Sequence, residues 1–181
     1  MSISDSMKID PRKETDKLVE FISFWTKELK RDGIVFGMSG GLDSTVVAYL
    51  AARTGMDTKA LIMPEKDTGK ENMDDAINAL EFLGIDYQVT DITEYLDSLG
   101  IYGLFPPDKI SLPDNLKKSV TLQSYRFYER RYGKSPFEAS LTGLAGEPLK
   151  KYPAPYNAYY RLKHRLRALL LYLCGEKENR L

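Results

Sequence analysis

The clearest chemical signal in this sequence is a short run of small and polar residues. The run Ser39-Gly40-Gly41-Leu42-Asp43-Ser44 places two hydroxyls, a carboxylate and paired glycines within six residues. Paired glycines let the backbone come close to a ligand and adopt positive φ at little cost. A carboxylate beside such a turn repels phosphate unless it holds Mg²⁺, a hard cation that takes oxygen ligands and bridges to phosphates. We therefore expect this run to bind phosphates together with magnesium, and Asp43 to be the metal ligand.

The residues on either side of this run predict a strand, a tight turn and the start of a helix. Apolar Ile34-Val35-Phe36 precedes the run, and residues 45–53 follow with helical spacing. A helix start presents unpaired N–H groups and a positive dipole end, which together attract phosphate. The run contains no lysine, so it differs from the Walker A loop. The alternative interpretation is a tight turn before a capped helix that binds nothing.

Three apolar segments alternate with helical patterns along the first half of the chain. Residues 34–36, 59–63 and 87–92 predict strands, while residues 18–29, 46–51 and 73–83 have the apolar spacing of helices. Asp10-Pro11 is a typical helix entry, Gly84 a typical helix end, and Val46, Val47, Leu50 and Ala51 are the expected buried stripe of the second helix. A further helix is expected over residues 156–177.

This order of elements predicts an α/β fold, with a parallel sheet covered by helices on both faces. Ligands in such sheets bind beyond the carboxyl ends of the strands. The glycine-rich run, the Met63-Pro64 corner and Asp91 all lie at the carboxyl ends of predicted strands, so we expect them at that edge.

The composition limits the class of protein. A chain of 181 residues is long enough for one domain, here predicted as residues 1–181 with a divergent, insert-like segment at about 100–155. Lysine plus arginine and aspartate plus glutamate both total 26, so no global basic field indicates nucleic acid. No apolar run approaches the roughly 20 residues of a membrane span, and the first residues lack an apolar signal core. With one cysteine, Cys174, no internal disulfide can form, and we expect a cytoplasmic protein.

The run at 39–44, placed after a strand, resembles the pyrophosphate loop of the N-type ATP pyrophosphatases, the PP-loop superfamily. Within that superfamily the chain is most similar to the ammonia-dependent NAD synthetases. Three parts carry this resemblance: residues 34–48, the segment Leu61-Ile62-Met63-Pro64 with the helix that follows it, and Arg165-Leu166-Arg167 in the last helix. The resemblance implies a PP-loop ATPase fold, also called adenine nucleotide alpha hydrolase-like.

The resemblance also implies a function in NAD biosynthesis. A ligase of this family adenylates deamido-NAD with ATP and Mg²⁺, releases pyrophosphate, and lets ammonia displace AMP to give NAD. It implies ATP binding by Gly37, Met38, Ser39, Gly40, Gly41, Asp43, Ser44 and the backbone near Met63. Asp43 would be the catalytic metal ligand, and Arg165 would contact the dinucleotide. The competing interpretation of Arg165 and Arg167 is a solvated helix face or a salt-bridge partner in a subunit interface. A homodimer is also implied.

Two features depart from the family pattern. The family continues after the Arg-x-Arg helix with a strand that pairs beside the nucleotide-loop strand, and then with a glutamate that is a second Mg²⁺ ligand. We expect that strand to begin beyond Leu181, which would leave the edge of the first strand exposed. The segment at about 100–155 is longer than expected, and its tyrosines alternate with Arg126, Arg130 and Arg131.

These departures keep two other functions open. The chain could be a nucleotide-binding module or subunit with little turnover. It could also adenylate a tRNA base, since aromatic and cationic side chains together suit a nucleobase. The balanced charge makes nucleic acid an unlikely partner, and tyrosines that pack on the sheet are the simpler interpretation of the segment.

Overall fold

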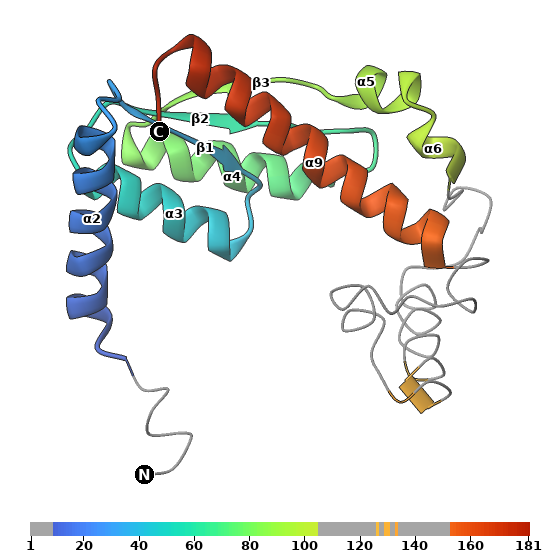
Figure 1. The fold of residues 1–181 in the computed structure, drawn as a ribbon, viewed down its shortest axis with the longest axis horizontal. Helices are drawn as coiled ribbons and strands as arrows, with labels where there is room; N and C mark the ends of the chain where they lie inside the picture. The colour runs from blue at the N-terminus through green and yellow to red at the C-terminus, as the bar shows by residue number, and fades with distance from the viewer. Residues whose placement is uncertain (1–8, 105–125, 127–128, 131–132, 134–152) are drawn as a thin grey trace. The chain divides into compact units, whose positions relative to one another are not determined.

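The computed structural model describes residues 9–104, 126, 129–130, 133 and 153–181 (Figure 1). The chain divides into two compact units, one of residues 1–95 and 164–181 and the other of residues 96–163. Most of the segment predicted as an insert at about 100–155, including Tyr125, Tyr128, Tyr132, Tyr152 and Arg131, lies outside the described residues, whereas Arg126 and Arg130 are described and exposed. Its role and the assignment of one domain therefore stay predictions.

The first unit contains a parallel sheet. Its strands are β1 (Ile34–Met38), β2 (Thr58–Ile62) and β3 (Asp86–Val89), hydrogen-bonded in the order β1-β2-β3. Met38 pairs with Ile62 at the carboxyl end of β1, and Ile62 pairs with Val89 at the carboxyl end of β2. The three carboxyl ends therefore meet at one edge of the sheet.

Helices cover both faces of this sheet, as predicted. The helices α3 (Leu42–Arg53) and α4 (Lys70–Leu83) lie on one side, and the part of α9 (Pro153–Lys177) that belongs to this unit lies on the other (Figure 1). A Cβ added at Gly37 would lie 3.4 Å from Leu171 Cδ1, so α9 packs directly on β1. The predicted α/β class is confirmed.

The helix boundaries follow local chemistry. The helix α2 (Pro11–Glu28), which packs on α3, begins where the Asp10 carboxylate accepts a hydrogen bond from the Arg12 amide at 3.1 Å. Helix α4 ends at Gly84 with φ of 66°, a left-handed conformation that glycine adopts without a Cβ penalty. Both boundaries were expected from the residue types.

The core of the first unit differs from the expected one in α3. The buried residues of α3 are Ala48 and Ala51, whereas Val46 and Val47 are 49% and 43% exposed. The predicted buried stripe was therefore wrong for both valines. The physical reason is crowding, because α3 contacts β1, β2, α2 and α4, and small side chains suit such close approach.

The second unit includes α6 (Ile101–Leu104) and the first part of α9, while α5 (Thr93–Ser98) runs from one unit into the other. Tyr102 and Tyr159 make an edge-to-face contact with ring centroids 6.4 Å apart. The buried Lys163 ammonium lies 3.8 Å from the Tyr159 centroid, a cation–π geometry. Among the described residues, no helix is both long and apolar enough to cross a bilayer.

The free edge of β1 is paired at its start by the last residues of the sequence. The Leu181 amide donates to the Gly33 carbonyl at 2.8 Å, and the Val35 amide donates to the Leu181 carbonyl at 2.9 Å. Gly33 and Arg180 form a parallel bridge. The expectation that strand pairing on this edge begins beyond Leu181 was therefore wrong.

A cluster of ion pairs holds this C-terminal segment at the amino end of the sheet. Glu178 bonds the Lys59 ammonium and accepts from Arg180 Nε at 2.9 Å, and Arg180 Nη2 lies 2.8 Å from the Asp57 carboxylate. The bonds from Lys59 and Arg180 lower the pKa of Glu178 to about 2. The ionised form is thus the one that the fold stabilises.

We predict a pH-dependent contribution from Glu178. Its pKa is depressed in the folded protein, so its stabilisation is present above the ordinary value of 4.5 and is lost as the pH falls toward 2. Glu178→Gln should therefore lower Tm at pH 7, and the difference from wild type should shrink between pH 4.5 and 2. Thermal unfolding followed by circular dichroism across this pH range measures the difference in Tm.

Glu176→Gln is the control for the general loss of a negative charge, because the Glu176 side chain is 71% exposed. A Tm difference for Glu178→Gln that is independent of pH would contradict the role of the cluster.

Candidate functional site

The glycine-rich turn lies between β1 and α3, at the edge where the strand ends meet. Gly40 has φ of +80°, and a Cβ at this position would collide with the backbone carbonyl of Asn72 in the first turn of α4. Glycine is therefore required at position 40 for two separate reasons, conformation and space. The turn is held against α4 by this close contact.

Gly41 is the N-cap of α3, and no side chain caps this helix. A side-chain cap normally satisfies one of the orphan N–H groups of the first turn. Without it, the start of α3 keeps donors and a positive dipole end for an anion. This is the feature of the structure that most directly suits phosphate.

The two serines of the run lie together. The Ser39 and Ser44 hydroxyl oxygens are 3.0 Å apart, and Ser44 Oγ also donates to the Gly41 carbonyl at 2.9 Å. The Ser39 amide donates to Ser44 Oγ at 3.3 Å, and the Gly41 amide donates to Ser39 Oγ at 3.3 Å. These bonds set the shape of the turn and keep both hydroxyls beside the start of α3.

Asp43 lies in the first turn of α3, and it is exposed. Among the described residues, no three histidine, cysteine or acidic side chains form a cluster suited to a metal. Mg²⁺ is commonly bound by one or two carboxylates, with water and substrate phosphates as its other ligands. An exposed carboxylate next to a phosphate-binding helix start fits that mode of binding, so Asp43 could hold the ion predicted from the sequence.

Met63 and Asp91 follow the carboxyl ends of β2 and β3, so both lie at the predicted edge. Met63 as a whole residue is only 6% exposed, and its carbonyl accepts a hydrogen bond from Arg167 Nε at 3.2 Å. The Asp91 carboxylate accepts a hydrogen bond from the Thr93 amide at 2.8 Å at the start of α5. The Thr93 hydroxyl and, to a smaller extent, this amide lower the pKa of Asp91 by stabilising its charged form. The Asp91 side chain thus serves to begin a helix.

The structure separates the two arginines of the last helix. Arg165 is exposed, whereas Arg167 donates from Nε to the Met63 carbonyl at 3.2 Å. Residues two apart on a helix point about 200° from each other, so the pair cannot share a face. Arg167, to which the sequence assigned no functional role, is the one that reaches the edge of the sheet. The one feature of the sequence that drew attention to Arg167 was the Arg-x-Arg pattern.

Comparison with known proteins identifies the family. The sequence pattern described as NAD synthase matches residues 14–118, which include the glycine-rich turn and all three strands. The chain belongs to the NAD synthase family. Its resemblance to the ammonia-dependent NAD synthetases is thereby confirmed at the level of the family.

Relatives within the NAD synthase family are similar along most of this chain. It is 38% identical over 164 residues to an NH(3)-dependent NAD(+) synthetase of Thermotoga maritima and 37% identical over 174 residues to that of Thermotoga neapolitana. These alignments cover 90% and 95% of this chain but 55% and 56% of the relatives. The chain therefore spans about half the length of the curated relatives it matches.

Solved structures support the fold of the family. An NMN synthetase of Francisella tularensis and an NH3-dependent NAD synthetase of Campylobacter jejuni each match with a TM-score of 0.61, at 24% and 22% identity. Each match covers 96% of this chain, and 53% and 55% of the respective structures. The predicted PP-loop ATPase fold is confirmed.

Proposed function

We propose that this chain performs the chemistry of an ammonia-dependent NAD synthetase, converting deamido-NAD, ATP and ammonia to NAD, AMP and pyrophosphate. The observation that carries the proposal is the start of α3, which has no side-chain cap, lies beside two hydroxyls and bears Asp43 in its first turn. Membership of the NAD synthase family supplies the substrate class.

In the first step, an oxygen of the substrate carboxylate attacks the α-phosphorus of ATP, and the bond to pyrophosphate breaks. The start of α3 and the hydroxyls of Ser39 and Ser44 would hold the phosphates, with Gly37 and Met38 shaping the strand end that leads to them. Asp43 would hold Mg²⁺, which neutralises charge on the phosphates when bound. The contribution of the protein is positioning and charge stabilisation.

In the second step, ammonia attacks the acyl carbon, AMP leaves with the bonding electrons, and the former ammonia nitrogen loses a proton to water to give the amide. Arg165 is proposed to bind the dinucleotide, because its exposed guanidinium stays charged and suits phosphate or carboxylate. The backbone of Met63 is proposed to lie by the adenine.

We also propose a cytoplasmic location for the protein. Cys174 is a free thiol, as is usual for cysteines in reducing compartments.

The adenylation step can be tested alone by isotope exchange between pyrophosphate and ATP. With Mg²⁺ and deamido-NAD present and ammonia absent, we expect labelled pyrophosphate to enter ATP. Omission of deamido-NAD is the control and should stop the exchange. Binding of ATP without exchange would instead support a nucleotide-binding module with little turnover.

We also propose a homodimer that uses the outer face of α2. Leu18, Phe21, Phe24 and Trp25 are all exposed on this helix, and contiguous exposed apolar side chains are typical of protein interfaces. In an antiparallel pair of α2 helices, this face of one copy would lie against the same face of the other. Such a pairing is self-complementary, as a two-fold interface requires.

We predict that the double substitution Phe21→Ser and Trp25→Ser shifts the protein from dimer to monomer. The reason is the loss of apolar area at the centre of the interface, where aromatic residues contribute most. Sedimentation velocity over a range of concentrations measures the shift. Phe82→Ser removes another exposed aromatic side chain, from α4, and should leave the dimer intact. A wild-type protein that stays monomeric would exclude this interface.

A further inference from the structure

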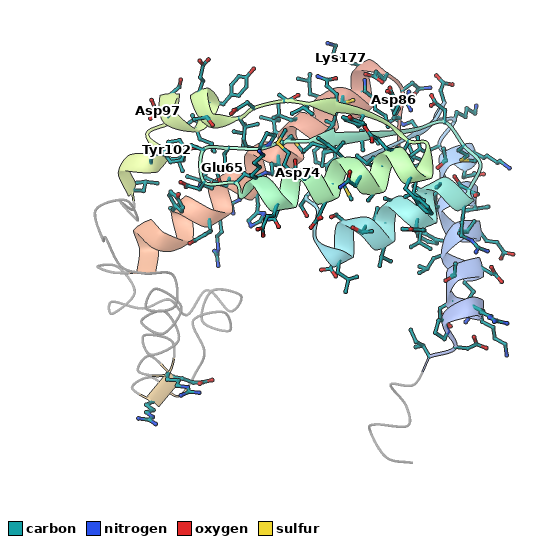
Figure 2. All side chains as sticks on the ribbon, turned by 180° about the vertical axis from the view of Figure 1, so that it is seen from behind. Glu65, Asp74, Asp86, Asp97, Tyr102 and Lys177 are labelled. Atoms are coloured by element: carbon teal, nitrogen blue, oxygen red, sulfur yellow. The ribbon has the colours of Figure 1, made fainter. Side chains whose placement is uncertain are left out.

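Arg167 joins α9 to the segment that follows β2. Its Nε donates to the Met63 carbonyl at 3.2 Å, and its Nη2 lies 3.8 Å from Oε1 of Glu65. The side chains of Arg167 and Glu65 are 27% and 8% exposed. Figure 2 labels Glu65 between the sheet and the start of α4. Ionic contacts this well buried are screened little by solvent.

The Met63 carbonyl needs a donor because β1 has already left β2 at this point. The pairing of the two strands ends at Met38 and Ile62, after which the chain turns through Ser39–Gly41 into α3. Met63 is one residue beyond the last pair and only 6% exposed. A buried carbonyl without a hydrogen-bond partner destabilises the folded state. Arg167 supplies the missing donor, and the glycine-rich turn can diverge from the sheet without that penalty.

The same segment continues into the helix that contacts the glycine-rich turn. The Glu65 amide donates to Thr68 Oγ1 at 2.9 Å, and the Thr68 amide donates to the Glu65 carbonyl at 2.8 Å. Helix α4 begins directly afterwards, and the carbonyl of Asn72 in its first turn abuts Gly40. A continuous set of contacts therefore runs from Arg167 through residues 63–72 to the glycine-rich turn.

We propose that Arg167 is a positioning residue for the nucleotide site. It fixes the carboxyl end of β2 and, through α4, the place and shape of the glycine-rich turn, without touching the nucleotide itself. The proposal rests on the proposed function, in that this edge of the sheet binds ATP.

The test compares ATP affinity among four proteins by isothermal titration calorimetry with Mg²⁺ present. Arg167→Met should weaken binding by roughly 10- to 100-fold, the effect of losing a charge-assisted hydrogen bond at a buried group. Arg167→Lys, which keeps the charge, should recover part of the affinity. Arg161→Met, an exposed position on the same helix, should bind as wild type does. Equal affinity of Arg167→Met and wild type would overturn the proposal.

Hydrogen exchange separates this proposal from the proposed function. Without ligand, Arg167→Met should exchange faster at residues 39–45 and 63–72 while circular dichroism shows the fold intact. If wild type binds no ATP, the proposed function fails, and the exchange result alone then decides whether Arg167 positions the turn. If Arg167→Met does not fold, Arg167→Lys takes its place in both measurements. Unchanged exchange in these segments would contradict the positioning role.

Discussion

Replacement of Asp43 by alanine is expected to abolish the release of pyrophosphate from ATP. The carboxylate lies in the first turn of α3, where it would hold Mg²⁺ against the phosphates. Loss of the metal would remove several kcal/mol of charge stabilisation, so the rate should fall by about 100-fold or more. A coupled assay for pyrophosphate measures it at saturating deamido-NAD.

The control for this variant is another exposed aspartate on the same unit. Asp86 begins β3 and so lies at the opposite end of the sheet from Glu65, as the labels in Figure 2 show. Asp86→Ala removes the same charge far from the glycine-rich turn and should keep the wild-type rate. Undiminished release by Asp43→Ala would remove Asp43 from the mechanism.

Substitution of Gly40 by alanine is expected to disrupt both the turn and nucleotide binding. Alanine at φ of +80° costs about 1–2 kcal/mol, and the clash with the Asn72 carbonyl adds about 1–3 kcal/mol. The turn must move away from α4 to relieve the clash, so ATP binding should be lost as well. Urea unfolding and calorimetric titration with ATP measure the two effects.

Gly55→Ala is the control that tests the effect of a positive φ without a steric clash. Gly55 has φ of +67°, and a Cβ there would meet nothing within 4 Å. This variant should lose about 1–2 kcal/mol of stability and keep its affinity for ATP. If Gly40→Ala and Gly55→Ala had the same effects on stability and ATP binding, the close contact between the glycine-rich turn and α4 would contribute nothing to ATP binding.

The elements of the fold were predictable where local chemistry determines them. Asp10 begins a helix through a side-chain cap, and Gly84 ends one through a left-handed cap, and both caps depend on residue type alone. The strands were visible as apolar segments between such signals, with boundaries that moved by one or a few residues. The glycine-rich run was visible for the same reason, because its conformation is local.

Features that depend on tertiary packing were not predictable from the sequence. Helix α3 itself has apolar residues on more than one side. The periodicity of the sequence therefore predicted a helix, but it did not show that Ala48 and Ala51 are the buried residues of that helix. The sequence predicted that the paired glycines let the backbone come close to a ligand, but it did not show that the backbone carbonyl of Asn72 lies against Gly40. Likewise, the pairing of Leu181 with β1 joins residues far apart in the chain.

The choice between Arg165 and Arg167 shows the same limit at the candidate site. Both arginines belong to one sequence pattern, and only the rotation of α9 against the sheet brings Arg167 to Met63. The dinucleotide role proposed for Arg165 comes from the family resemblance, whereas the positioning role proposed for Arg167 follows from that rotation. The Arg-x-Arg spacing alone contains no information about it.

The most direct test of the proposed function is incubation of the purified protein with ATP, Mg²⁺, ammonia and deamido-NAD, followed by chromatography of AMP and NAD. We predict that both products form in equal amounts and that neither forms when deamido-NAD is omitted. Binding of ATP with no AMP and no NAD would contradict the assignment of ammonia-dependent NAD synthetase activity to this chain.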